Sequence, residues 1–145
     1  MKSMKQKELE DIIVRDNLII ESLVQWVTIE HERKDIFGLF SEMGYRKIAI
    51  YGYGHLGKLL ETLLKDSEIR VVCVLDRKFK ETEGYHLSPT ALPSDLDAVI
   101  VTNTYFYREI RDGLLKNGCT SEIRMLDELL FQLWGSKTQW MYYLH

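Results

Sequence analysis

The chain has 145 residues, of which 46% are hydrophobic and 28% are charged, with nine glycines, two prolines and a net charge of -3. This composition is typical of one soluble globular domain and excludes disordered, collagen-like and low-complexity chains. Basic and acidic residues nearly balance, with seven Lys or Arg against nine Asp or Glu in residues 1–46 and twelve against thirteen in residues 47–145. Neither part has the basic excess of a nucleic-acid-binding surface, so we expect no nucleic-acid partner.

The two cysteines, Cys73 and Cys119, form no CxxC motif and no disulfide framework, and no His or Cys cluster has the spacing of a zinc site. Cys73 stands in an apolar run and is expected to be buried. No apolar stretch reaches the length of about 18 residues that a membrane-spanning helix needs, and the charged first residues do not resemble a secretion signal. We therefore expect a cytoplasmic protein with no membrane span and no bound metal.

The first 46 residues are expected to form a helical N-terminal extension. Residues 5–31 carry apolar side chains at spacings of three and four, which predicts a long amphipathic helix. Its apolar stripe consists of Leu9, Ile12, Ile13, Ile19, Ile20, Leu23, Val24 and Val27. A second helical pattern over residues 36–43 ends at Gly44, a natural C-terminal cap. The long helix exceeds what is needed to cover a sheet, so we expect part of its stripe to pack on a second copy in a homodimer.

After residue 46, short apolar runs alternate with helical patterns. Strands are expected at residues 47–52, 70–76, 97–102 and 122–125, helices at 56–64, 105–116 and 127–133, and an edge strand or turn at 85–87. Within the expected strand at 70–76, residues 71–75 are apolar throughout, as strands of parallel sheets are when both faces are covered. Residues 47–133 are therefore predicted to form an α/β domain with a Rossmann-like, doubly wound parallel sheet and right-handed crossovers. An aromatic tail follows at residues 134–145 and is expected to pack on the core.

One motif in this pattern indicates a ligand. Residues 52–57 read GYGHLG, a GxGxxG sequence that follows an expected strand and opens an expected helix, and Asp76 ends the next strand 22 residues after Gly54. In such a motif Gly52 permits a tight turn, Gly54 lets a pyrophosphate approach the backbone, and Gly57 allows the helix to pack closely on the strand. The free N–H groups of the helix N-terminus would bind the phosphates, and Asp76 would accept hydrogen bonds from ribose hydroxyls.

The expected nucleotide-binding residues are Gly52, Tyr53, Gly54, His55, Leu56, Gly57, Asp76, Arg77, Thr102 and Asn103. Thr102 and Asn103 end a later strand, where ligands gather in open α/β sheets, although Asn103 would also suit the cap of the following helix. Arg77 suits a 2′-phosphate, but the Asp76 carboxylate would repel one, which favours NAD slightly over NADP. Two alternatives remain open: Arg77 as part of a solvated loop, and a glycine turn that binds nothing.

No residue is assigned to catalysis from the sequence. The Tyr-x-x-x-Lys pair by which short-chain dehydrogenases and epimerases move a proton is absent, because Tyr105 is followed at that spacing by Glu109 and Tyr107 by Arg111. The four histidines are scattered and share no catalytic or metal-binding spacing.

From Lys47 to about Leu130, the segments KIAIYGYGHLGKLLETLLK, VVCVLDRK, GYHLSP, LPSDLDAVIVTNTYFYREI and EIRMLDELL resemble the small nucleotide-binding domains found around nucleoside-diphosphate-sugar epimerases. They are also similar to the N-terminal Rossmann-like domains of bacterial polysaccharide-biosynthesis proteins, including sugar acyltransferases. The resemblance implies a domain that binds NAD(P) or a nucleotide sugar in surface-polysaccharide pathways. About 15 residues follow Leu130, so the substrate-binding part of an epimerase and the repeat β-helix of an acyltransferase are not expected.

Three functions follow as hypotheses. The first is a nucleotide-binding module for NAD(P) or a nucleotide sugar that acts with a partner enzyme of polysaccharide biosynthesis. The second is a minimal NAD(P)-dependent nucleotide-sugar epimerase or dehydrogenase whose site is completed across a dimer. The third is a structural partner protein in which the glycine loop is only a turn.

Overall fold

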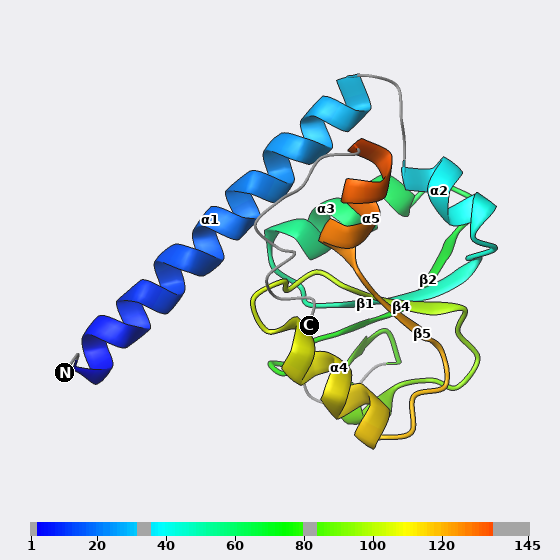
Figure 1. Ribbon diagram of the computed structural model, residues 1–145. Coiled ribbons are helices and arrows are strands. Elements are labelled where there is room, and N and C mark those ends of the chain that lie inside the picture. The colour runs from blue at the N-terminus through cyan, green and yellow to red at the C-terminus, as the bar shows by residue number, and fades with distance from the viewer. Residues whose placement is uncertain (1–2, 32–35, 80–83, 135–145) are drawn as a thin grey trace.

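The computed structural model describes residues 3–31, 36–79 and 84–134, and Figure 1 shows how their helices and strands are arranged. The helices are α1 (Met4–His31), α2 (Ile36–Glu42), α3 (His55–Leu64), α4 (Tyr107–Lys116) and α5 (Leu126–Trp134), and a 3-10 turn spans Pro89–Ala91. The strands are β1 (Lys47–Tyr51), β2 (Arg70–Leu75), β3 (His86–Leu87), β4 (Ala98–Val101) and β5 (Glu122–Met125). Every helix and strand expected from the sequence is present, and no end differs by more than two residues.

The five strands form one parallel sheet in the order β3-β2-β1-β4-β5, which confirms the predicted α/β class. The chain runs outward from β1 to β2 and β3, then returns to place β4 on the other side of β1. This reversal creates a topological switch point between β1 and β4, where the chain after β1 leads to α3 on one face of the sheet and the chain after β4 leads to α4 on the other. Pro89 follows β3, the short strand at one edge, so its missing N–H interrupts no inner ladder.

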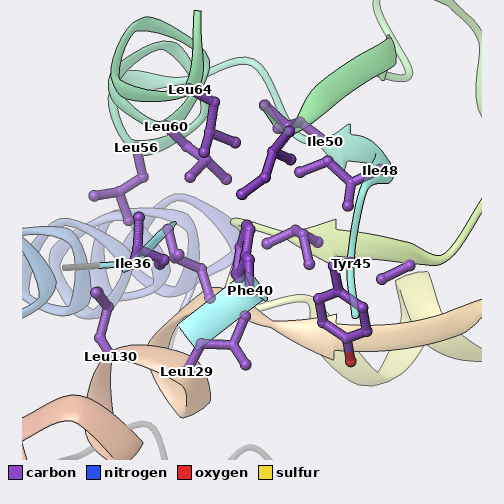
Figure 2. Close-up of a cluster of buried hydrophobic side chains, with 14 of the residues drawn as sticks. Ile36, Phe40, Tyr45, Ile48, Ile50, Leu56, Leu60, Leu64, Leu129 and Leu130 are labelled. Atoms are coloured by element: carbon purple, nitrogen blue, oxygen red, sulfur yellow. The ribbon is translucent and has the colours of Figure 1, made fainter. Parts of the chain in front are cut away.

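Helices cover both faces of the sheet (Figure 1). On one face α3 and α5 pack with α2 and the second half of α1, and α4 covers the other face. Alternate residues of β1 divide between the two cores: Ile48 and Ile50 face α3, whereas Ala49 and Tyr51 face α4. Figure 2 shows the first core, in which aliphatic side chains from α3 and α5 surround the sheet residues. Burial on both faces explains why β1, β2 and β4, the inner strands of the sheet, are apolar apart from Lys47 and Arg70 at their first positions.

The orientation of α1 differs from the one that its apolar spacing predicts. Its first turns extend beyond the rest of the molecule (Figure 1), and its second half lies across α3 and α5. The side that packs on the domain carries Leu18 and Trp26 together with the polar Ser22 and Gln25, all of them buried. Of the expected apolar stripe, Ile19 and Leu23 contact the core. The other members, Leu9, Ile12, Ile13, Ile20, Val24 and Val27, are exposed.

The expected tail at 134–145 lies outside the described residues, apart from the backbone of Trp134 at the end of α5. In the part of the chain that the structure describes, no helix is long and apolar enough to cross a membrane.

Candidate functional site

The expected nucleotide-binding residues meet at one edge of the sheet because the strands are in register. Tyr51 at the end of β1 pairs with Leu75 of β2 on one side and with Val101 of β4 on the other. The residues that come next, Gly52, Asp76 and Thr102, therefore lie side by side at the carboxyl edge. This is the position in which open α/β sheets bind ligands, at the switch point between β1 and β4.

Two of the three motif glycines are required by the fold itself. Gly52 has a φ of +102°, and a Cβ at this position would lie 2.6 Å from Thr102 Oγ1. A Cβ on Gly57 would lie 1.9 Å from the carbonyl oxygen of Gly52, well below any real contact distance. Gly52 thus forms the turn and Gly57 lets α3 pack against it, as the motif predicted.

Gly54 has no such structural requirement. Its φ of -86° and ψ of -158° are accessible to any residue, and no atom lies within 4 Å of where its Cβ would be. The space above Gly54 is open and belongs to the cleft described below. A glycine here therefore serves neither the turn nor the packing of the described residues, and it leaves the backbone accessible to a ligand.

The N-terminus of α3 points its first amides at the same opening. The helix begins at His55, and its first ladder bond runs from the N–H of Lys58 to the carbonyl of Gly54 at 3.0 Å. The N–H groups of His55, Leu56 and Gly57 therefore lie in the first turn of the helix, where amides have no intrahelical acceptor. The Leu56 side chain is buried in the core and His55 is exposed, so Leu56 contributes its backbone to the cleft.

Asp76 holds the glycine turn in place. Its Oδ2 accepts a hydrogen bond from the N–H of Tyr53 at 3.0 Å, and its Oδ1 accepts one from the N–H of Lys78 at 3.0 Å. Each carboxylate oxygen keeps further acceptor capacity, and Asp76 lines the cleft described below. Arg77, the next residue, is exposed and also lines the cleft.

The two expected residues after β4 have structural partners. Thr102 is buried, and its hydroxyl lies 3.0 Å from the carbonyl oxygens of both Tyr51 and Gly52, so it braces the glycine turn against β4. Asn103 Oδ1 accepts a hydrogen bond from the N–H of Phe106 at 3.2 Å, just before α4. The N-cap of α4 is Phe106, with no side-chain cap, so Asn103 holds the turn before the helix and does not cap the helix itself. Both Thr102 and Asn103 still line the cleft.

These residues line a cleft with a volume of about 560 Å³. Its far wall is formed by α1, which contributes Arg15, Asp16, Leu18 and Ile19. Arg15 is paired with Asp16 at 3.7 Å, so this wall carries both signs of charge, whereas the residues after β2 contribute the cations Arg77 and Lys78. The sequence did not predict this wall, since nothing in residues 5–31 indicates which helix face meets the sheet edge.

Polar contacts connect α1 to the segment between β4 and α4. The Tyr105 hydroxyl donates a hydrogen bond to Asp11 Oδ1 at 2.6 Å. One residue earlier, the Thr104 hydroxyl donates to Asp127 of α5, and Asp127 is also hydrogen-bonded to the Ser22 hydroxyl of α1. Only 2% of the surface of Asp127 is exposed, and burial raises the pKa of its carboxyl to about 6.

The side chain of Tyr53, which lines the cleft, packs into an aromatic cluster. Its ring packs against Phe79 and His86, and its hydroxyl donates to Glu61 of α3 at 2.8 Å, beside the hydroxyl of Tyr85. The hydrogen bond to Glu61 and partial burial raise the pKa of Tyr53. Tyr53 thus anchors the glycine loop to α3. Within the described residues no group of three His, Cys, Asp or Glu side chains is placed to hold a metal ion.

The doubly wound parallel sheet, with a glycine turn and a cleft at its switch point, defines the chain as a Rossmann-like α/β domain. Residues 44–124 match the family described as C2185-like, N-terminal, and the chain belongs to this family. The matched range contains β1 to β4, α3 and α4, whereas α1, α2 and α5 lie outside it. No curated protein and no solved structure matches the chain.

Proposed function

We propose that this protein is a nucleotide-binding module whose ligand is NAD(P) or a nucleotide sugar, with NAD slightly favoured. The observation that carries the proposal is Gly54: it lines the cleft, its backbone conformation needs no glycine, and nothing in the described structure occupies the space of its missing side chain. A binding loop explains this glycine, and an architectural turn does not.

In this proposal the phosphates bind at the N-terminus of α3 against the amides of His55 and Leu56, since a helix N-terminus favours anions. The Asp76 oxygens accept hydrogen bonds from ribose hydroxyls through the acceptor capacity that the loop amides leave. The same carboxylate would repel a 2′-phosphate, which favours NAD over NADP. Arg77 supplies positive charge from the wall after β2, whereas Arg15 on the α1 wall is paired with Asp16.

The test is thermal unfolding and calorimetric titration with NAD, NADP and a panel of UDP-, GDP- and CDP-sugars. A ligand at 100 times its dissociation constant stabilises a fold by about 2.7 kcal/mol, which raises Tm by several degrees. Gly54→Val should keep the Tm of the free protein and lose the ligand-induced shift. Gly113→Val is the matched control. A Cβ on this α4 glycine also meets nothing within 4 Å, and Gly113 does not line the cleft. A wild-type protein that none of these ligands stabilises would contradict the proposal.

The cellular role rests on the resemblance in sequence, which supports a place in nucleotide-sugar or surface-polysaccharide metabolism. Both cysteines are free thiols, which fits the reducing cytoplasm. We further propose that a second copy of the chain covers the exposed face of α1. In support, Ile13, Ile20 and Val27 follow one another at intervals of seven residues, the period of a coiled-coil seam, and all three are more than half exposed.

A further inference from the structure

Two polar connections join α1 to the segment at residues 102–106 that follows β4, called here the β4 loop. One is direct, from the Tyr105 hydroxyl to Asp11. The other passes through Asp127, which is hydrogen-bonded to Ser22 of α1 and to Thr104 of the β4 loop. The two connections are separated by three turns of α1, so together they fix both the position and the rotation of the helix relative to the loop.

Asp127 is the group on which the second connection depends. It lies in the first turn of α5 and is almost completely buried, and its two carboxyl oxygens are both used, one for each hydroxyl. Ser22 Oγ also lies 2.9 Å from the carbonyl oxygen of Leu18. A serine hydroxyl has one proton, so it cannot donate to the Leu18 carbonyl and to an ionised Asp127 at once.

A neutral carboxyl satisfies every one of these contacts. Its O–H donates to Ser22 Oγ, Ser22 donates to the Leu18 carbonyl, and Thr104 donates to the other oxygen of Asp127. The ionised form takes the serine proton away from Leu18 and places an unpaired negative charge in an apolar interior, which is costly.

The charged surroundings do not offset that cost. The α1 face brings Glu21, whose negative charge raises the pKa of Asp127 further. The β4 loop contributes only uncharged side chains. Other charged groups on the elements packed around Asp127 are already paired or exposed. Arg15 of α1 is paired with Asp16 at 3.7 Å, Glu128 of α5 is paired with Arg124 of β5 at 3.2 Å, and Glu42 of α2 is exposed.

We propose that Asp127 is a positioning residue that docks α1 and the β4 loop as one unit and thereby sets the shape of the nucleotide cleft. Both elements line that cleft, α1 through Arg15 and Asp16 and the loop through Thr104 and Tyr105. The consequence for ligand affinity rests on the function proposed above, whereas the docking itself does not.

The docking depends on pH in a defined direction. When α1 is docked, burial holds the pKa of Asp127 at about 6, and when the helix is released, the solvated carboxyl returns to an ordinary pKa of about 3.9. The docked form therefore binds the proton more tightly, so protonation favours docking fully below about pH 4, and this advantage is lost as the pH rises from about 4 to 6. Across that window each pH unit shifts the equilibrium toward release by up to about tenfold, or roughly 30-fold between pH 4 and 6, and above pH 6 the further shift is only about twofold.

The experiment is hydrogen–deuterium exchange on the full chain without ligand between pH 4 and 7.5, with rates corrected for the intrinsic effect of pH. In the wild type we expect amides of α1 and of the β4 loop to lose protection together as the pH rises from about 4 to 6, with little further change above pH 6. Asp127→Asn should hold both segments at their low-pH protection, since the amide reproduces the hydrogen bonds of the neutral carboxyl. Asp127→Ala should expose both segments at every pH. Asp112→Asn, which removes an exposed carboxyl from α4, should behave as wild type.

Loss of protection in α1 alone, or an unchanged pH step in Asp127→Asn, would overturn the proposal. In a second arm, NAD serves as the probe, and its affinity should follow the docked fraction in each variant. A wild-type protein that does not bind NAD would count against NAD as the ligand of the proposed nucleotide site, while the exchange data would still decide whether Asp127 docks the helix. If NAD bound with the same affinity whatever the docked fraction, the proposal that docking of α1 shapes the nucleotide cleft would be wrong.

Discussion

Replacing Gly57 with alanine tests the packing that creates the cleft. The added Cβ would lie 1.9 Å from the carbonyl oxygen of Gly52, and real Cβ atoms essentially never approach closer than 3.0 Å. Both colliding groups are fixed to the backbone, so no side-chain rotation relieves the contact. The first turn of α3 must move away from the end of β1, which separates Leu56 and Leu60 from Ile50 in the core shown in Figure 2.

The expected cost follows from opposing terms. Overpacking a well-filled interior costs about 1–3 kcal/mol and occasionally more, and a clash between two backbone groups belongs at the upper end. Alanine is a better helix former than glycine by about 1 kcal/mol, which offsets part of the loss. We therefore expect Gly57→Ala to lower the free energy of unfolding by about 2 kcal/mol, a fall in Tm of roughly 6 °C for a chain of this size.

Gly54→Ala is the matched control, since it makes the same chemical change three residues earlier where no atom lies within 4 Å. Its stability should stay within about 0.5 kcal/mol of wild type or rise slightly, because alanine reduces the freedom of the unfolded chain. Urea unfolding followed by circular dichroism at 222 nm measures both variants. If Gly57→Ala were no less stable than Gly54→Ala, the close approach of α3 to the glycine turn would be wrong, and with it the geometry of the cleft.

Three further predictions concern other parts of the molecule. If a second copy covers α1, Ile20→Glu should convert the protein to a 17.1 kDa monomer in light scattering, whereas Leu115→Glu, at a similarly exposed position on α4, should not; equal masses for both variants would contradict the dimer. Asp97 accepts hydrogen bonds from two backbone N–H groups at the start of β1, which lower its pKa, so its stabilising effect is present above about pH 4 and is lost as the pH falls further. Asp97→Asn should therefore flatten the acid limb of stability against pH, and an unchanged limb would refute this role. Burial raises the pKa of the Cys73 thiol to about 11, so iodoacetamide at pH 8 should label Cys119 in the native protein and reach Cys73 only after denaturation, as read by mass spectrometry.

The sequence predicted the helices, the strands and the position of the glycine turn because these depend on local signals. Uniformly apolar runs specify strands covered on both faces, and Gly44, with a φ of +76°, ends α2 where the pattern expected it. Gly52 and Asp76 lie at the same sheet edge because each directly follows a strand, and parallel strands end together. Such relations need no knowledge of which distant residues meet.

The wall formed by α1 could not be predicted in this way. Apolar spacing indicated a stripe that contains Ile20 and Val24, yet these side chains are exposed, and the buried side carries Ser22 and Gln25. Ser22 is buried because its partner is Asp127, 105 residues further along the chain. The sequence around Ser22 and Asp127 does not indicate that these two residues pair. The rotation of α1 about its axis therefore depends on long-range contacts, and so does the wall of the cleft that α1 forms.

Most residues of the GxGxxG motif have structural roles, which limits what the motif alone says about function. Gly52 and Gly57 are explained by a positive φ and a close approach of backbone, and Thr102 and Asp76 hold the turn by hydrogen bonds within the chain. A turn that bound no ligand would need all four. Gly54 is different, because its conformation and surroundings accept a side chain. Variation at Gly54 therefore separates a binding loop from an architectural one, whereas variants of the other motif residues would confound loss of binding with loss of structure.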